Sequence, residues 1–183
     1  MNRINNAFRL NELRKAEFRV SNKKLYYTGS TVTPELKVAY RNKLLTEGTH
    51  YELTFENAVE PGKATFKING IGQFTGTLTG EYIIIPAKVK IESASSDTAG
   101  TIDLSWVNEG SVDSYEILLY TTRSNGFVRS TETFSAAGSD SSIKITTGLK
   151  SGKRLNVFVR AYKIIDGEPV YSKYGSSQSV TVS

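Results

Sequence analysis

The residue types that most often carry out chemistry are scarce in this chain of 183 residues. It has no cysteine and one histidine, His50. Disulfides, thiolate nucleophiles and thiolate metal sites are therefore excluded, as is metal binding by a pair of histidines. His50 stands in the segment EGTHYEL, and no Gly-x-Ser-x-Gly motif occurs in the chain. We interpret His50 as a turn or strand-surface residue and predict no enzyme activity.

The glycine-rich stretch GIGQFTGT, residues 70–77, comes close to a dinucleotide-binding fingerprint. Gly70, Gly72 and Gly76 have the spacing Gly-x-Gly-x-x-x-Gly, which is one residue too long. The next segment, TLTGEYIII, alternates like a strand, whereas a nucleotide site needs a helix N-terminus there. We therefore predict a hairpin turn and no cofactor.

Aspartates are spread one to a turn, in SSDTAG, SVDS, GSDSS and IIDGE. None of these turns forms the Asp-x-Asp-x-Asp-Gly loop that gathers oxygen ligands around calcium. A calcium ion held between several turns is left open by the sequence. Turn chemistry alone explains the residues, so we predict no metal site.

Aromatic residues offer the clearest candidate for ligand contact. The chain has ten tyrosines, and most alternate with polar residues as expected for core or cross-strand packing. Tyr171 and Tyr174, in PVYSKYG, lie near the last expected strand and could form a small exposed patch. Such a patch would contact a carbohydrate or a protein. Packing against the end of a sandwich is the alternative.

The net charge of +5 is concentrated at the N-terminus. Residues 1–20 hold five basic and two acidic side chains, whereas residues 21–87 hold seven and six and residues 88–183 hold eleven and ten. A nucleic-acid-binding domain would show a basic face within its folded part. We expect no nucleic-acid partner, and no apolar run is long enough for membrane insertion.

The elements that must position these residues are strands. From residue 18 onward, short runs rich in Val, Thr, Tyr, Phe and Ile alternate with turns, with no helical interval. In the first part they are FRVSN, ELKVAY, YELTFE, ATFKING and GTLTGEYIII. Gly29 is expected to supply a turn and Pro34 the start of a strand. This pattern predicts an all-β fold of sandwich type.

A second β-module follows Pro86, which cannot donate to a central strand ladder. Seven strand candidates lie beyond it: KVKIES, TIDLSWV, SYEILLY, GFVRSTE, SSIKITT, LNVFVRAYKI and QSVTVS. Residues 88–183 are close in number to a seven-stranded immunoglobulin-like sandwich. We predict two tandem immunoglobulin-like β-sandwich modules, residues 18–87 and 88–183, after an arm of residues 1–17.

The second module resembles a fibronectin type III domain. The resemblance rests on TIDLSW with Trp106, on DSYEILLY with Tyr115, and on GLKSGKRLNVFVRAY with its Leu-x-x-Gly turn. It implies that Trp106 and Tyr115 face the core. The family's corner tyrosine is replaced by Leu155, so its hydrogen bond should be missing or replaced.

The first module is similar to a short immunoglobulin-like repeat of bacterial surface proteins. The similarity covers residues 25–84, through LYYTGSTVTP, LTEGTHYELTF and GIGQFTGT. Both resemblances imply spacers, adhesive modules or display platforms, although a fold alone does not determine which.

Residues 1–17, MNRINNAFRLNELRKAE, differ in composition from the rest, with no Val, Thr or Gly. Their apolar positions make a poor amphipathic stripe, so a short helix and an extended arm are both compatible with the sequence. A disordered terminus is the alternative to an ordered attachment arm. The residues that we expect to contact an assembly partner are Ile4, Phe8, Arg9, Leu10, Leu13 and Arg14.

These features lead to two expected functions. The modules resemble surface domains, yet the chain begins with Met and shows neither a secretory leader nor an anchor motif. We therefore expect a non-enzymatic structural component of a bacteriophage virion, such as a head decoration or tail accessory protein, made in the host cytoplasm. The arm would bind a capsid or tail protein, and the modules would present a surface to host carbohydrate or protein. The alternative is a spacer or adhesion fragment of a secreted bacterial cell-surface protein.

Overall fold

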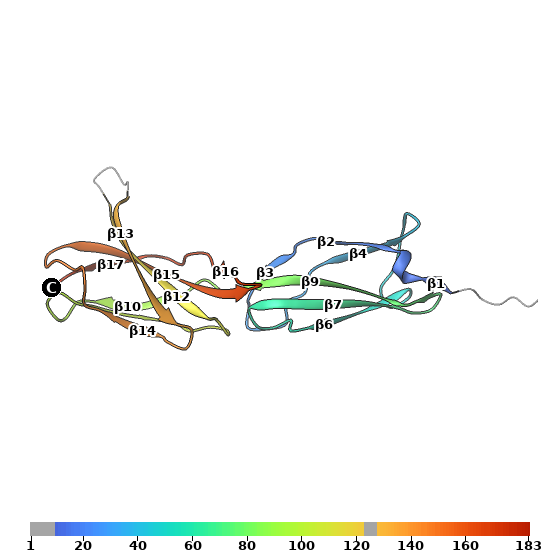
Figure 1. Cartoon of the computed structure of the whole chain (residues 1–183), viewed down its shortest axis with the longest axis horizontal. Helices are drawn as coiled ribbons and strands as arrows, with labels where there is room; N and C mark the ends of the chain where they lie inside the picture. Colours follow the sequence, from blue (N-terminus) through green and yellow to red (C-terminus); the bar gives the residue numbers. More distant parts are fainter. Residues whose placement is uncertain (1–9, 123–127) are drawn as a thin grey trace, which may run out of the picture. The chain divides into compact units, whose positions relative to one another are not determined.

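The computed structural model describes the backbone of residues 10–122 and 128–183, and the side chains of residues 10–121 and 132–183. The described residues are all-β apart from one turn of 3-10 helix (Figure 1). The chain divides into two compact units. The N-terminal unit comprises the described part of Met1–Leu25 together with Val32–Ala58 and Lys63–Ile83, and the C-terminal unit comprises Tyr26–Thr31, Val59–Gly62 and Ile84–Ser183.

Two main sheets form the N-terminal unit. One has the strand order β2-β4-β5, and the other has the order β3-β9-β7-β6. A small parallel pair, β1-β8, adds the first strand of the described residues. The strands are β1 (Asn11–Glu12), β2 (Glu17–Val20), β3 (Lys24–Tyr26), β4 (Leu36–Tyr40), β5 (Lys43–Leu44), β6 (Tyr51–Glu56), β7 (Gly62–Gly70), β8 (Phe74–Thr75) and β9 (Thr77–Ile85).

Alternation along these strands builds the core of the N-terminal unit. On β7, Ala64, Phe66 and Ile68 are buried while their neighbours are only partly buried. The ring of Phe66 meets that of Phe18 edge-on, at 5.5 Å between centroids. On β4, the alternating position Val38 is fully buried. One inward face per strand is the pattern expected when each sheet has a single apolar side.

The C-terminal unit is a two-sheet sandwich. One sheet has the order β10-β11-β14; the other has the order β13-β12-β15-β16, with β17 also pairing with β15. The chain crosses between sheets after β11, β13 and β14. The strands are β10 (Ile91–Ser95), β11 (Ile102–Trp106), β12 (Ser114–Thr122), β13 (Val128–Ala137), β14 (Ser142–Ile145), β15 (Arg154–Ile165), β16 (Glu168–Tyr171) and β17 (Gln178–Thr181).

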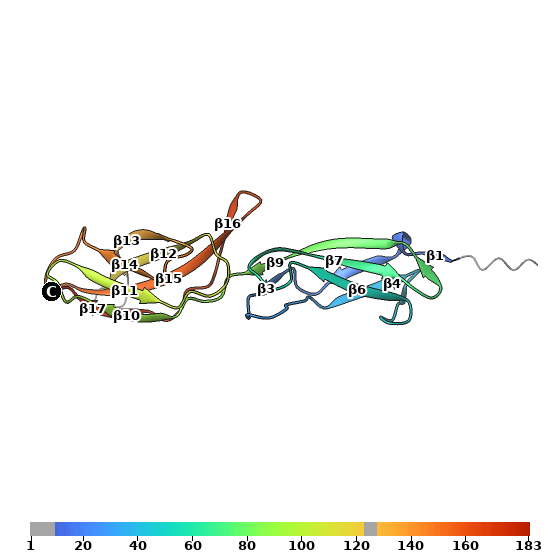
Figure 2. The same cartoon turned by 90° about the horizontal axis from the view of Figure 1, so that it is seen from below.

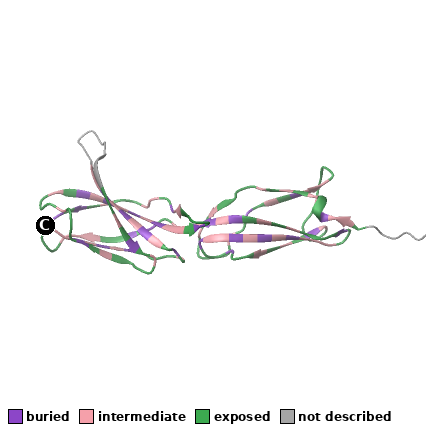
Figure 3. Ribbon diagram, viewed as in Figure 1, coloured by how far each residue is buried: buried purple, intermediate pink, exposed green. Residues whose placement is uncertain are grey.

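The core of the C-terminal unit lies between these two sheets. Figure 3 shows buried bands alternating with more exposed ones along the strands. Trp106 on β11 and Tyr115 on β12 are each 1% exposed, and their ring centroids lie 5.1 Å apart. Both therefore face the core, as the fibronectin type III resemblance implied. The Tyr115 hydroxyl donates to the Asn108 side chain at 2.7 Å.

The residue at the expected corner-tyrosine position, Leu155, is buried in this core. Backbone hydrogen bonds close the adjacent turn. The Lys153 amide donates to the Lys150 carbonyl at 3.2 Å, and the Gly152 amide donates to the Val182 carbonyl at 2.8 Å. These main-chain hydrogen bonds tie the turn before β15 to Val182.

All twelve strands expected from the sequence correspond to strands of the structure. The strands that sequence reasoning missed are short: β1, β3, β5, β8 and β16. They have between two and four residues each, so they carry too few positions for alternation to reveal. Part of the segment GFVRSTE lies outside the described residues, and β13 continues past it to Ala137.

The expected boundary between arm and first module needs correction. The structured part of the N-terminal unit begins near residue 11, not at residue 18, because β1 pairs with β8 and a 3-10 turn, Leu13–Lys15, follows. Leu13 is fully buried in this turn. The physical reason is that its side chain completes the core of the N-terminal unit, which leaves it unavailable to an external partner.

Candidate binding surface

The outward face of the sheet formed by β13, β12, β15 and β16 carries a connected group of aromatic side chains. On β15, Leu155, Val157, Val159 and Ala161 are buried against the core. Because successive side chains in a strand point to opposite faces, the intervening residues point away from the core. These outward residues of β15 are Asn156, Phe158, Arg160 and Tyr162, and all are half-buried.

The rings are close enough to form a chain of contacts. Tyr120 of β12 stacks on Phe158, with centroids 5.4 Å apart and planes 10° from parallel. Phe158 in turn contacts Tyr174 at 5.3 Å, and Tyr162 contacts its cross-strand partner Tyr171 at 5.2 Å. We call these five residues and Arg160 the aromatic strip. Contacts of this kind add stabilisation beyond area burial, so they hold the rings in position.

Arg160 joins the two halves of the strip. Its guanidinium carbon lies 3.7 Å from the centroid of Tyr171 and 4.7 Å from that of Tyr174. Its Nε donates to Glu116 Oε1 at 2.7 Å, and Glu116 lies directly opposite it on β12. Two cation–π contacts and a charge-assisted hydrogen bond restrict the arginine to one orientation.

The same carboxylate also holds Tyr174. The Tyr174 hydroxyl donates to Glu116 Oε1 at 3.0 Å. Burial of the ring, and then this hydrogen bond, raise the pKa of Tyr174 above its ordinary value. Both causes favour the neutral phenol, because a buried phenolate would be poorly solvated and would repel Glu116. Tyr174 therefore acts as a hydrogen-bond donor within the strip.

The β15–β16 hairpin and the segment that follows it place Tyr171 and Tyr174 on this face. Figure 2 shows β16 beside the end of β15, and its turn uses Asp166 and Gly167 with φ of 54° and 85°. Beyond β16, buried Ser172 fastens the chain: its amide donates to the Ala161 carbonyl at 2.8 Å, and the Ala161 amide donates to the Ser172 hydroxyl at 3.1 Å.

Gly175 then passes tightly against the segment that precedes β10. A Cβ at this position would collide with the carbonyl oxygen of Val89, so only glycine fits. The Gln178 amide group donates to the Ile91 carbonyl at 3.2 Å, and β17 begins there. The segment between β16 and β17 is thus held at both ends, which positions Tyr174 over β15.

Sequence reasoning named only part of this surface. Tyr171 and Tyr174 are brought together around Arg160, and both are half-buried. The other four residues of the strip, Tyr120, Phe158, Arg160 and Tyr162, were not predicted. The period-two alternation of LNVFVRAY already placed Phe158, Arg160 and Tyr162 on one face, which is a signal that could have found them. The contact with β12 depends on strand register, which the alternation alone does not reveal.

The predicted attachment residues differ in their position and exposure. Ile4, Phe8 and Arg9 lie outside the described residues. Leu10 has 52% of its surface exposed, and Leu13 is buried. The exposed Arg14 Nε pairs with Glu12 at 2.8 Å. Within the described residues, therefore, Leu10 and Arg14 are the predicted contacts that reach the surface.

The other motifs weighed in the sequence have structural roles. His50 accepts a hydrogen bond at Nδ1 from the Thr46 amide at 2.8 Å and packs edge-on against Phe74. The GIGQFTGT stretch forms the predicted connection between β7 and β9, closed by the Gly70 amide donating to the Gly76 carbonyl at 2.9 Å.

In the described part of the chain, no group of three acidic or histidine side chains could hold a metal ion. No described helix is long and apolar enough to cross a membrane.

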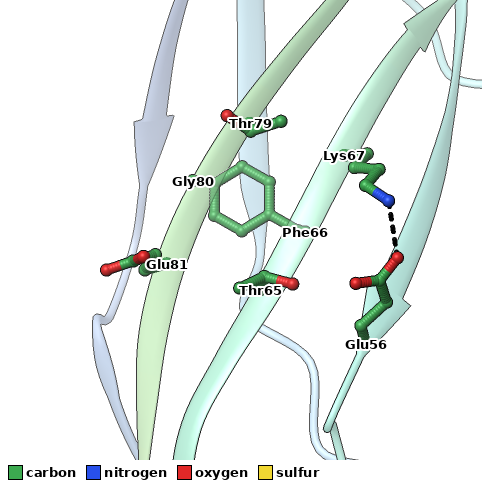
Figure 4. Close-up of a pocket in the computed structure, with 7 residues that line it drawn as sticks. All are labelled: Glu56, Thr65, Phe66, Lys67, Thr79, Gly80 and Glu81. Atoms are coloured by element: carbon green, nitrogen blue, oxygen red, sulfur yellow. Dashed lines mark hydrogen bonds and ion pairs between the residues drawn. The ribbon is translucent and has the colours of Figure 1, made fainter.

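The N-terminal unit has a depression of about 480 Å³ over β6, β7 and β9 (Figure 4). Glu56, Thr65, Lys67, Thr79 and Glu81 line it, together with Phe66 and Gly80. The Lys67 ammonium pairs with Glu56 at 2.5 Å, and the Lys63 ammonium pairs with Glu81 at 3.6 Å. Because these charges are already paired across a sheet face, the aromatic strip is the stronger candidate for ligand contact.

No protein-family model matches the sequence, and neither does any curated protein. Among solved structures, the FN1–FN3 domains of chicken CNTN1 align with 90% of this chain at 15% identity and a TM-score of 0.43; this chain covers 66% of that one, just under two thirds. The chicken interferon gamma receptor alpha chain aligns with 91% of this chain and 96% of its own length, at 11% identity and a TM-score of 0.48. The strand order and the buried cores identify the fold as a pair of fibronectin type III or immunoglobulin-like sandwiches.

Proposed function

We propose that this protein is a non-enzymatic display protein whose C-terminal unit binds a partner through the aromatic strip. The observation that carries this proposal is the pre-set arrangement around Arg160, with rings at 3.7 and 4.7 Å and Glu116 at 2.7 Å. Tyrosine and arginine are the side chains most enriched where binding energy is concentrated. A rigid surface also loses less side-chain entropy on binding.

The non-enzymatic part of the proposal is supported by the use that the fold makes of His50. Its Nδ1 is occupied by the Thr46 amide at 2.8 Å, within a turn. A general base needs a nitrogen directed at a substrate proton. Asp113, whose pKa is lowered, has a structural partner, because its carboxylate accepts from the Ile164 amide at 2.7 Å.

The biological setting that we propose is a bacteriophage virion, with attachment through the N-terminal segment. The alternative is a spacer or adhesion module of a secreted bacterial surface protein. What supports both is the resemblance of the two modules to bacterial surface domains. Attachment would involve residues 1–9 and the exposed Leu10, because Leu13 is committed to the core.

Deletion of residues 1–9 tests the attachment step without removing Leu13. We expect the truncated protein to melt at the same temperature as the full chain and to lose co-purification with phage particles. The Leu13→Ala variant is the matched control, because it keeps the segment but opens a cavity that costs about 2–5 kcal/mol. Full occupancy of particles by the truncated protein would contradict attachment through this segment.

Alanine substitutions test the strip as a binding surface. Phe158→Ala and Tyr120→Ala should each weaken adhesion of labelled protein to host bacterial cells by about tenfold or more, as expected for central aromatic contacts. Lys144→Ala is the control, since Lys144 is exposed on β14 of the opposite sheet, where it pairs with Asp103. Equal adhesion of all three variants and the original protein would exclude the strip as the binding surface.

A further inference from the structure

We propose that the aromatic strip binds a carboxylate-bearing sugar, with the carboxylate on the Arg160 guanidinium and the sugar ring against the neighbouring aromatic faces. This inference rests on the proposed function and specifies its ligand. It follows from three properties of the strip: the N–H donors of Arg160 that remain unused, the charge of the outward face, and the position of the aromatic rings beside hydroxyl-bearing side chains.

Arg160 keeps hydrogen-bonding capacity after its own contacts are made. A guanidinium has five N–H donors, and Nε is used by Glu116. Glu116 is the only described residue that accepts a hydrogen bond from Arg160. Tyr171 and Tyr174 cover the faces of the guanidinium, so its free edge is where the remaining donors lie. The Arg160 side chain is 25% exposed, so a ligand can reach part of it.

The free edge is suited to a carboxylate. Guanidinium N–H groups bind a carboxylate through two parallel hydrogen bonds, which are shorter and stronger than neutral ones. The rings and Glu116 hold the guanidinium in one orientation, so little conformational entropy is lost when a ligand binds. Arg160 would therefore act as a fixed receptor for an acidic group.

The charge of the outward face favours an anion. Strand register places Glu116 and Arg160 opposite each other, and Arg154 points to the same side two positions before Asn156. Among the described outward residues of β12, β15 and β17, these three are the charged ones, so basic residues exceed acidic ones by one. Glu116 neutralises part of Arg160, and exposed Arg154 lies on the same face six residues earlier in β15, so the net charge of these outward residues is positive.

The rings favour a sugar over an acidic peptide. Sugars present a face of C–H groups that packs on an aromatic ring, together with hydroxyls at the edge. Tyr120 and Phe158 lie 10° from parallel, and Thr133 and Ser135 stand on the same outward face in β13. An extended peptide is usually recognised by pairing with a strand edge. Four residues of the strip lie on β12 and β15, and each of these strands is already paired with neighbours on both sides.

Titration of the full chain with defined glycans tests this proposal. The carboxylated probes are oligogalacturonate and oligosialic acid, and the neutral counterpart is the methyl ester of oligogalacturonate. Calorimetry should show binding of at least one carboxylated probe, with affinity about tenfold or more lower for Arg160→Gln and for the methyl ester. Arg154→Gln, the matched control on the same strand, should lose about threefold or less, because it supplies only long-range charge.

Three results would overturn the proposal. Failure of both carboxylated probes to bind would exclude an acidic sugar, and equal binding of the methyl ester would show that the carboxylate is not recognised. Tighter binding of polyglutamate than of either glycan, with the same loss in Arg160→Gln, would identify an acidic peptide instead. In each of these cases the adhesion loss of Phe158→Ala, measured separately, still decides whether the strip is a binding surface. The melting temperature of each variant, followed through Trp106, confirms that it is folded.

Discussion

The phenol of Tyr174 is held between Arg160, Phe158 and Glu116, and this environment makes a testable difference to its ionisation. Burial, followed by the hydrogen bond to Glu116, raises its pKa above 10.0. A raised pKa means that the neutral form stabilises the fold at all pH values below 10, and that this contribution is lost as the pH rises through the folded pKa.

We therefore expect Tyr174→Phe to remove one late step from the alkaline absorbance titration of tyrosine. The difference between the original protein and the variant should have its midpoint above pH 10. A midpoint at or below pH 10 for this difference would contradict the raised pKa of Tyr174.

Asp113 is a second residue whose charge has structural consequences. Its carboxylate accepts from the Ile164 amide at 2.7 Å and from the Lys163 ammonium at 2.9 Å, tying the start of β12 to β15. The backbone hydrogen bond, and then Lys163, lower its pKa below 3.8. The stabilisation is therefore present above pH 3.8 and is lost as the pH falls through the folded pKa.

We expect Asp113→Asn to lower the free energy of unfolding by roughly 1 kcal/mol at neutral pH, since the pair with Lys163 is partly solvated. The loss should shrink as the pH falls below 3.8, because the original carboxyl then becomes neutral too. Denaturant unfolding followed by Trp106 fluorescence measures this difference. A penalty that is constant down to acid pH would show that charge is not its cause.

At the scale of elements, the packing of β7 against β9 depends on Gly80 having no side chain. Figure 4 shows the Phe66 ring beside Gly80, and a Cβ on residue 80 would overlap that ring. Phe66 is 1% exposed, so it has little room to move. A glycine inside a strand ordinarily weakens it, and here the gap is filled by an aromatic ring from the neighbouring strand.

We expect Gly80→Ala to destabilise the N-terminal unit by about 1–3 kcal/mol, the usual cost of overpacking. In a Phe66→Leu background the same change should cost clearly less, because the ring that it overlaps is gone. Thermal unfolding of the four proteins in this cycle measures the coupling between the two positions. Equal costs in both backgrounds would mean that the ring does not explain the glycine.

At the scale of the whole molecule, the cores are separate in sequence. The apolar cluster of the C-terminal unit is built entirely from residues between Val89 and Val182. It contains Trp106, the single tryptophan of the chain. A unit with its own core and sheets can fold alone.

We therefore expect a fragment of residues 84–183 to fold cooperatively, with the Trp106 emission of the full chain. In the full chain, Leu13→Ala should lower the transition of the N-terminal unit, seen by calorimetry, and leave the transition reported by Trp106 in place. If Trp106 remained solvent-exposed in the fragment, the C-terminal unit would need residues outside this range in order to fold.

The sequence by itself determined the fold class, most of the long strands and the core positions of Trp106 and Tyr115, because alternation and turn residues are local signals that need no partner strand. The same local signals made Tyr171 and Tyr174 candidates for ligand contact. Only the tertiary structure decided what surrounds them. The pairing of Glu116 with Arg160 depends on the register of two strands 44 residues apart, and no local pattern encodes that register. The sequence likewise did not predict the burial of Leu13, because its short turn has no periodicity of its own and is positioned by packing alone.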